Sequence, residues 1–310
     1  MITVVNLSTA VDKAYIIKNI NIGTVHRVTA EATTPGGKGL NVAKSIRLLG
    51  EDVVVTGFNG DRTSAYIEEE MKRRGVACDF VNVPGEARYN IHIMDNQAGK
   101  STSFLEQGFK VSDADVKKFL SKFTKLCDQS EMIVISGSAP EGCDDDIYTK
   151  IISITNEKGK RVLLDTSGDL LKNGIGAKPF MVKPNVEEMR RLLGRPISGK
   201  WQLVEGATNV FDMGIPLVVV STGAEAAVAV SWDGVLSCKP PAVKAVNDVG
   251  CGDAMMAGFA VGLSKGYPLE DIFSMAVAAA TANVVTLEPG MFRMEDYEMF
   301  RSKMKVTRIM

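Results

Sequence analysis

Residues 247–253 read NDVGCGD, and an unbroken apolar run follows them from Ala254 to Leu263. The two glycines on either side of Cys251 can take positive φ angles and let the backbone come close to a ligand. The apolar run is typical of a buried helix. We therefore expect Asp253 at a helix N-terminus, beside unpaired N–H groups that attract anions, phosphate above all.

Asp253 has two interpretations at this point. Aspartate is a preferred N-cap, so the residue could simply cap the helix, and for this stretch alone the cap is the commoner role. A helix N-terminus also keeps a carboxylate ionised, which suits a general base at neutral pH. The rest of the chain has to decide between the two.

Composition limits the classes of function. The chain has 310 residues and a net charge of −1, so nothing indicates a broad nucleic-acid or anionic membrane surface. The five cysteines form no C-x-x-C pair, which argues against a zinc site or a disulfide framework and fits a cytoplasmic protein. No apolar run is long enough to span a bilayer, and the start lacks the cationic segment of a signal peptide.

Strand-like and helix-like segments alternate regularly from residue 110 onward. The strand-like segments are continuous apolar runs, which indicates a parallel sheet buried on both faces. We expect an α/β fold in one domain, residues 1–310, with a doubly wound, mostly parallel sheet flanked by helices. Residues 15–27 alternate loosely and are interpreted as a short hairpin, and 87–105 predict a second hairpin, whose greater polarity places it at an edge or in a separate small sheet. The chain closes with a hairpin over 226–238, helices over 254–263 and 269–285, and a helical tail.

A second glycine-rich loop, Thr34 to Gly39, comes before a helix predicted over 40–49. Pro35 and Gly36 indicate a sharp turn. The loop is not a Walker A motif, because Ala32 stands where that motif needs glycine, and it lacks the last glycine of a dinucleotide fingerprint.

Polar residues follow the strands of the predicted sheet. Ligands in such sheets bind beyond the C-terminal ends of the strands, so these residues should lie together. They are Asp12, Ser136 to Ser138, Asp165, Lys183 to Asn185, Ser221 to Gly223 and Gly250 to Asp253.

Taken together, these motifs resemble the ribokinase-like carbohydrate kinases. The resemblance covers nearly the whole chain and rests on Gly36-Gly37-Lys38-Gly39-x-Asn41, Lys183-Pro184-Asn185-x-x-Glu188, Ser221-x-Gly223-Ala224-Glu225 and Gly250-x-Gly252-Asp253. Arg88-Tyr89-Asn90 and the segment from Ile135 to Pro140 are similar to the branch that contains 1-phosphofructokinase and tagatose-6-phosphate kinase.

The resemblance implies an ATP- and Mg²⁺-dependent phosphotransfer. Asp253 would be the general base, and the N–H groups of Gly250, Cys251 and Gly252 would form an anion hole for the transferring phosphoryl group. Glu188 would hold Mg²⁺. The nucleotide site would comprise Lys183, Asn185, Ser221, Gly223, Ala224, Glu225, Ala226 and Gly252, with Asn283 bordering the adenine.

The resemblance also implies a sugar site. Its residues would be Asp12, Gly37, Lys38, Asn41, Arg88, Asn90 and Ser138. Lys38 and Arg88 would bind a phosphate already on the substrate, since two cations suit a dianion. Residues 11–30 and 86–107 would form a β lid that excludes water. Lids of this type often pair between subunits, so a homodimer through the lid is one expectation.

Several functions stay open at this stage. Phosphorylation of fructose 1-phosphate to the 1,6-bisphosphate is the first choice, and tagatose 6-phosphate is the close alternative. Lys38 and Arg88 disfavour an unphosphorylated sugar or nucleoside. A sensor that binds a sugar phosphate or nucleotide without turnover is the alternative from another class, but it would not need Asp253, Lys183 and Glu188. The family commonly has alanine at the position of Cys251, so we expect alkylation of this thiol to slow phosphoryl transfer.

Overall fold

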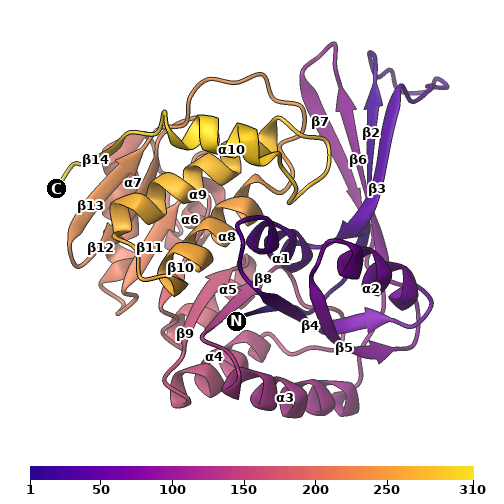
Figure 1. The fold of residues 1–310 in the computed structure, drawn as a ribbon, viewed down its shortest axis with the longest axis horizontal. Helices are drawn as coiled ribbons and strands as arrows, with labels where there is room; N and C mark the ends of the chain where they lie inside the picture. The colour runs from indigo at the N-terminus through magenta and orange to yellow at the C-terminus, as the bar shows by residue number, and fades with distance from the viewer.

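The computed structural model describes all 310 residues. A ten-stranded sheet crosses the molecule in the order β14-β13-β12-β11-β10-β9-β8-β1-β4-β5 (Figure 1). Its strands are β1 (Ile2–Asn6), β4 (Val53–Gly60), β5 (Ala77–Val83), β8 (Met132–Ser136), β9 (Arg161–Asp165), β10 (Met181–Val182), β11 (Leu217–Val220), β12 (Ala227–Ser231), β13 (Gly234–Cys238) and β14 (Val306–Arg308). All pairs from β5 to β11 are parallel, and those from β11 to β14 are antiparallel.

Helices cover both faces of this sheet, which confirms the doubly wound α/β prediction. On one face lie α1 (Lys38–Leu48), α2 (Ser64–Arg73), α8 (Cys251–Ser264) and α9 (Leu269–Val284), with α10 (Met294–Arg301) packed on α9. On the other lie α3 (Asp113–Asp128), α4 (Ile147–Glu157), α5 (Gly168–Gly176), α6 (Val186–Leu193) and α7 (Gly199–Phe211). No helix is long and apolar enough to cross a membrane.

Successive side chains of the central strands enter opposite cores. In β8, Met132 and Val134 belong to one buried cluster, while Ile133 and Ile135 belong to the other. Because side chains alternate along a strand and both faces are covered, the four residues from Met132 to Ile135 are all apolar and read as a continuous run.

A separate four-stranded sheet projects from one end of the molecule, as Figure 1 shows. Its strands, in the order β3-β2-β6-β7, are β2 (Ala10–Ile17), β3 (Ala30–Gly36), β6 (Arg88–Asp95) and β7 (Lys100–Leu105). The second predicted hairpin is confirmed, since β6 and β7 pair antiparallel.

The prediction of a hairpin within residues 15–27 was wrong. β2 instead pairs with β3, from Ala10 opposite Gly36 to Ile16 opposite Ala30. Pro35 therefore lies in a strand and not in a sharp turn. A proline is tolerated there because β3 is an edge strand and its missing N–H breaks no ladder bond. The helical tail was correct only for α10, because β14 follows it and pairs with β13.

Candidate active site

A polar cavity of about 500 Å³ lies at the C-terminal ends of the parallel strands. Asn6 ends β1, Asp165 ends β9, and Lys183 and Ser221 follow β10 and β11 directly; all four line the cavity. The small sheet contributes Asp12, Arg88 and Asn90 from the other side, and α1 contributes Lys38 and Asn41. The clustering expected from the positions of these residues at strand ends is therefore present.

The glycine-rich loop before α8 is held in a backbone conformation that requires glycine. Gly250 is the N-cap of α8 with a φ of 84°. A Cβ atom at this position would also lie 2.9 Å from the backbone nitrogen of Gly290. The first N–H groups of α8 have no partner within the helix and form its positive end, so this loop can cradle an anion.

Asp253 does not cap this helix. α8 begins at Cys251, so Asp253 is its third residue, and its side chain makes no capping hydrogen bond. The carboxylate is 4% exposed, lines the polar cavity and accepts a hydrogen bond of 2.9 Å from Asn41 Nδ2. The capping interpretation is therefore excluded, and the side chain faces the space that a ligand would fill.

Burial raises the pKa of Asp253 to about 6, although Lys38, Lys183 and the hydrogen bond from Asn41 act in the opposite direction. The helix terminus therefore does not hold this carboxylate at the low pKa expected from sequence, because desolvation and the nearby Asp165 outweigh the favourable charges. At pH 7 the group is still mostly ionised. A base with a pKa close to the working pH is well matched to proton abstraction.

Asp165 joins the two cavity lysines. It is buried, and its two carboxylate oxygens lie 3.4 Å from Lys38 Nζ and 3.1 Å from Lys183 Nζ. Burial alone would raise the pKa of Asp165, but the two ammonium groups outweigh it and lower the pKa. Asp165 therefore fixes the positions of both cations while staying ionised itself. Among the sequence predictions it was only one of the polar residues at strand ends, without a role.

Lys38 contacts Asp165 at 3.4 Å and lines the same cavity as Asp253 and Glu188. The charges that raise its pKa most are Asp165, then Asp253 and Glu188. These are the groups expected around the transferring phosphoryl. Lys38 thus stands between the predicted sugar side and the predicted nucleotide side of the cavity.

The predicted sugar side is organised around Asp12. Its Oδ1 accepts a hydrogen bond of 2.8 Å from Asn90 Nδ2, and both residues are buried at the base of the small sheet. A Cβ atom at Gly36 would lie 2.0 Å from Asp12 Oδ1, so the glycine-rich loop makes room for this carboxylate. Arg88 donates a hydrogen bond of 3.2 Å to Ser138 Oγ, which brings the two together as predicted. Gly37 also lines the cavity.

Asn185 and Glu188 form the start of α6. Each side chain accepts a hydrogen bond of 2.9 Å from the other residue's backbone N–H, a reciprocal capping box. Both also line the polar cavity near Lys183. The carboxylate of Glu188 is thus oriented by its own helix. No group of three or more His, Cys, Asp or Glu side chains is arranged to hold a metal ion.

A second cavity, of about 690 Å³, adjoins the first, and Ser221 and Gly252 line both. Half of its lining residues are hydrophobic, in contrast to the polar cavity. Gly223, Ala224 and Glu225, which the sequence predicts for a nucleotide site, line it together with Cys251. This composition suits a flat aromatic base with its phosphates directed toward the polar cavity.

Two residues predicted for the nucleotide site lie elsewhere. Ala226 does not line this cavity, although its neighbour Ala227 does. Asn283 is buried, donates hydrogen bonds to Val249 O and Cys251 Sγ, and accepts one of 2.7 Å from Gly290 N. Asn283 therefore ties the start of α8 to Gly290 and does not itself line the second cavity. Its position on a helix gave no sign of these contacts, because the fold brings its partners together from segments distant in sequence.

Both acidic and basic side chains line the polar cavity, His92 among them. Four carboxylates, of Asp12, Asp165, Glu188 and Asp253, face three cations, Lys38, Arg88 and Lys183. Asn6 was not predicted but lines the cavity, where its Oδ1 accepts a hydrogen bond of 3.0 Å from Gly39 N and its Nδ2 is buried without a partner. Its position at the end of a buried strand could have identified Asn6 as a candidate site residue.

Comparison with known proteins gives a consistent result. The model of the pfkB family of carbohydrate kinases matches residues 4–290. The tagatose-6-phosphate kinase of Staphylococcus epidermidis is 31% identical over 313 residues, and the 1-phosphofructokinase of Bacillus subtilis is 31% identical over 309, with full coverage of both chains in each case.

Solved structures agree over the whole fold. A possible 1-phosphofructokinase from Thermotoga maritima has a TM-score of 0.92 at 25% identity, with 100% of this chain and 99% of that chain covered. Phosphofructokinase-2 from Escherichia coli, in complex with substrates and products, has a TM-score of 0.91 at 26% identity, with 97% and 98% covered.

Proposed function

The chain belongs to the pfkB family of carbohydrate kinases, and we propose that it transfers the γ-phosphoryl group of ATP to a ketohexose monophosphate, giving the 1,6-bisphosphate. Fructose 1-phosphate is the first choice of substrate. The observation that carries the proposal is the buried carboxylate of Asp253, which faces a polar cavity from the first turn of α8 and lies next to the glycine shared with a second, half-apolar cavity.

Asp253 accepts the proton of the attacking sugar hydroxyl as its oxygen bonds to the γ-phosphorus, while the bond from that phosphorus to the bridging oxygen breaks and ADP leaves. Its raised pKa, about 6, leaves it mostly ionised at pH 7 while keeping it basic enough for the task. The backbone N–H groups of Gly250, Cys251 and Gly252 stabilise negative charge on the transferring group. Lys38 and Lys183, held by Asp165, add positive charge on the facing side.

Glu188 is the residue that would hold Mg²⁺, with Asn185 beside it. The donor set fits, because Mg²⁺ in kinases is usually bound through one or two carboxylates while substrate phosphates and water supply the other oxygens. The ion would neutralise the ATP phosphates and orient them. The capping box fixes the carboxylate of Glu188 before any ligand arrives.

The sugar binds between the small sheet and α1. Asp12 and Asn90 accept and donate hydrogen bonds with its hydroxyls, and Arg88, with Ser138, binds the phosphate it already carries. Lys38 lies between that phosphate and the transferred one. Arg88 is half-buried with an unpaired Nε atom, so a dianion would satisfy donors that now lack an acceptor.

The small sheet acts as the lid of this site. On β7, Leu105 lines the polar cavity, whereas the adjacent Phe104, whose side chain points to the other face of the strand, is 59% exposed although it is large and apolar. We propose that two lids pair in a homodimer and that Phe104 lies in their contact. The five free cysteines suit the reducing cytoplasm, where we place the enzyme.

An ADP-release assay over a panel of sugars tests the proposal. We expect the highest kcat/KM for fructose 1-phosphate or tagatose 6-phosphate, the closest alternative because both reactions need similar contacts. Preference for an unphosphorylated sugar or nucleoside would contradict the role of Arg88. Binding of sugar phosphate and ATP without any turnover would favour the sensor.

A further inference from the structure

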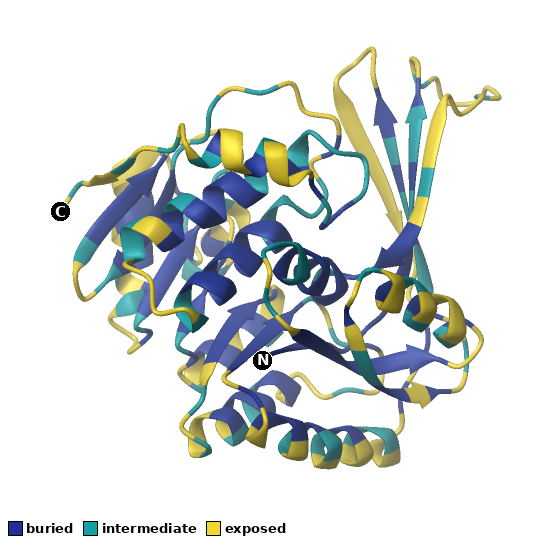
Figure 2. Ribbon diagram, in the orientation of Figure 1, coloured by how far each residue is buried: buried dark blue, intermediate teal, exposed yellow.

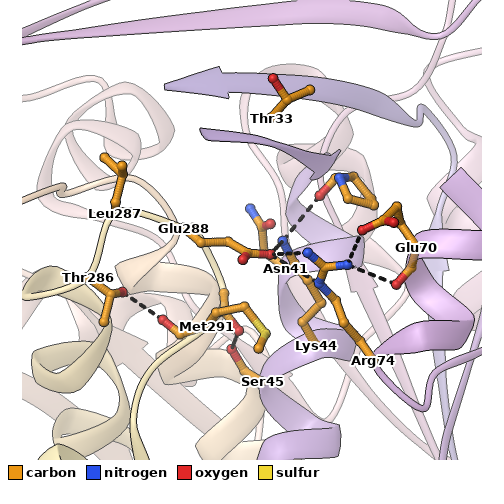
Figure 3. Close-up of polar contacts among 12 residues, drawn as sticks. Thr33, Asn41, Lys44, Ser45, Glu70, Arg74, Thr286, Leu287, Glu288 and Met291 are labelled. Atoms are coloured by element: carbon orange, nitrogen blue, oxygen red, sulfur yellow. Dashed lines mark hydrogen bonds and ion pairs between the residues drawn. The ribbon is translucent and has the colours of Figure 1, made fainter. Parts of the chain in front are cut away.

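Four charged residues gather behind Asp253 and outside both cavities. They are Lys44 on α1, Glu70 and Arg74 at α2, and Glu288 in the segment 286–291 that follows α9. Figure 3 shows Lys44 and Arg74 converging on Glu288 from the side of α1 and α2. We call them the rear cluster. Neither the resemblance nor the proposed reaction assigns them a role.

Lys44 is the innermost member. Its side chain is 0% exposed, and its Nζ donates a hydrogen bond of 3.1 Å to Pro35 O and lies 3.8 Å from Glu288 Oε1. Burial lowers its pKa to about 8, although the charges of Glu288, Asp12 and Asp253 oppose this shift. A buried ammonium group is unfavourable for stability unless it is paired, and a buried pair often contributes little net stability. Its presence therefore points to a role other than stability.

Glu288 is held from a second side by Arg74. Arg74 Nε and one terminal nitrogen donate hydrogen bonds of 3.1 and 2.9 Å to the same Glu288 oxygen. The other terminal nitrogen of Arg74 donates to Glu70 Oε2 at 2.7 Å. These contacts fix Glu288, and with it the segment 286–291, against two helices at once.

That segment touches the catalytic machinery directly. Ser45 Oγ donates a hydrogen bond of 2.9 Å to Gly290 O. A Cβ atom at Gly290 would lie 2.6 Å from Asn41 O, and one at Gly250 would lie 2.9 Å from Gly290 N. Atoms packed this closely cannot shift independently. A movement of the segment 286–291 must therefore displace either Asn41, which donates a hydrogen bond to Asp253, or the anion-hole loop.

The same cluster reaches the small sheet. Lys44 bonds the carbonyl of Pro35 at the base of β3, and Tyr66 OH of α2 donates a hydrogen bond of 3.2 Å to Thr33 O of the same strand. Gly36, next in that strand, packs on Asp12. The rear cluster is thus the place where the base of the small sheet and the segment behind Asp253 are tied to one another.

We propose that Lys44 and Glu288 are positioning residues for phosphoryl transfer: their ion pair holds the segment 286–291 so that Asn41, Asp253 and the anion hole stay aligned with the base of the small sheet. The inference rests on the proposed role of Asp253. It concerns how the base is placed and not which sugar is used.

Two neutral, nearly isosteric substitutions test it: Glu288→Gln and Lys44→Met. Misplacement of a catalytic group by about 1 Å can cost on the order of 10²-fold, so we expect kcat to fall roughly 10- to 100-fold. KM for ATP and for the sugar should change much less, because neither residue lines a cavity. The matched control is Glu51→Gln, which breaks a 3.1 Å ion pair with Lys265 just beyond the far end of α8 and should leave kcat unchanged.

A double-mutant cycle separates positioning from stability. If the pair acts as a unit, Glu288→Gln should lower kcat far less in the Lys44→Met background than in the wild type. Melting temperatures confirm that each variant is folded at the assay temperature. If Lys44→Met does not fold, the kcat of Glu288→Gln alone tests the proposal. A wild-type kcat in folded Glu288→Gln, or a loss confined to KM, would overturn the proposal.

All variants are assayed with whichever sugar the wild type phosphorylates best. A wrong choice of substrate therefore leaves this test intact. Failure of the proposed base would appear separately, as activity retained by Asp253→Asn.

Discussion

The two sheets of the molecule differ in what surrounds them. The large sheet is buried between helices on both faces, whereas β7 of the small sheet is exposed at every position and β3 is exposed along most of its outer half (Figure 2). A strand packed on both faces holds the residues at its end in a fixed place. A strand attached only along its base can move as a unit. We therefore expect residues from the large sheet and its helices to govern kcat and those of the small sheet to govern substrate affinity.

The largest effect on kcat should come from a substitution at Asp253, on a helix that packs against the large sheet. Asp253→Asn removes the proton acceptor, and general base catalysis contributes about 10²–10⁴-fold, so kcat for ADP release with sugar phosphate should fall by that factor. The melting temperature at pH 7 should not fall, because the wild type buries an ionised carboxylate at a cost. Wild-type turnover by this variant would show that the assigned base is wrong.

The small sheet is tested by Arg88→Ala. A hydrogen bond to a charged group contributes about 1.5–3 kcal/mol, so KM for the sugar phosphate should rise roughly 10- to 100-fold. KM for ATP should stay near its wild-type value, since Arg88 lines the polar cavity only and not the second cavity. Steady-state titration of each substrate measures both constants. An equal rise in the two KM values would contradict the expectation that the small sheet governs affinity for the sugar phosphate.

Lowering the pH should reduce kcat/KM gradually through the protonation of Asp253. Asp253 has a pKa raised to about 6, so it is mostly ionised at pH 7 and gains a proton as the pH falls through 6. At pH 5 about a tenth remains ionised, and kcat/KM should be about tenfold lower than at pH 7. Carboxyl NMR titration, with Asp253→Asn to assign the resonance, checks the pKa directly. A resonance that titrates near pH 4 would mean that burial does not control this group.

The smallest effect on chemistry should come from the outer face of the lid. Phe104→Asp places a charge at this exposed apolar position, and a surface change of this kind usually alters stability by less than about 0.5 kcal/mol. We expect weaker dimerisation in light scattering after size exclusion, with little change in monomer melting temperature. A wild type that is monomeric at high concentration would exclude pairing through the lid.

The large sheet was predictable because its strands leave a strong pattern. Continuous apolar runs, such as residues 132–135, occur where both faces are buried, and they identified the parallel strands correctly. α5 gave no such pattern because glycines stand at 168, 174 and 176. Gly174 is there for contact with β9: a Cβ atom would lie 2.7 Å from the side chain of Leu164. A local sequence pattern does not reveal a close approach of this kind.

The candidate site was predictable only as a set of residues. The position of Asp165 at the end of a predicted strand identified it as a candidate site residue. Its function, however, depends on two lysines, one of them 127 residues away in sequence. The contacts of Asn283 were unpredictable for the same reason, since the fold brings its three partners, Val249, Cys251 and Gly290, to it. The pKa of Asp253 likewise depends on how deeply the helix start is buried, and the fold sets that depth.

The excess of one carboxylate in the polar cavity has a consequence for how anionic substrates arrive. The whole chain also has a net charge of only −1, so the protein has no strong positive field that would draw free nucleotide from a distance. The association rate should therefore respond only weakly to ionic strength. The nucleotide would enter most readily when its counter-ion travels with it, and recognition would begin at short range, after contact.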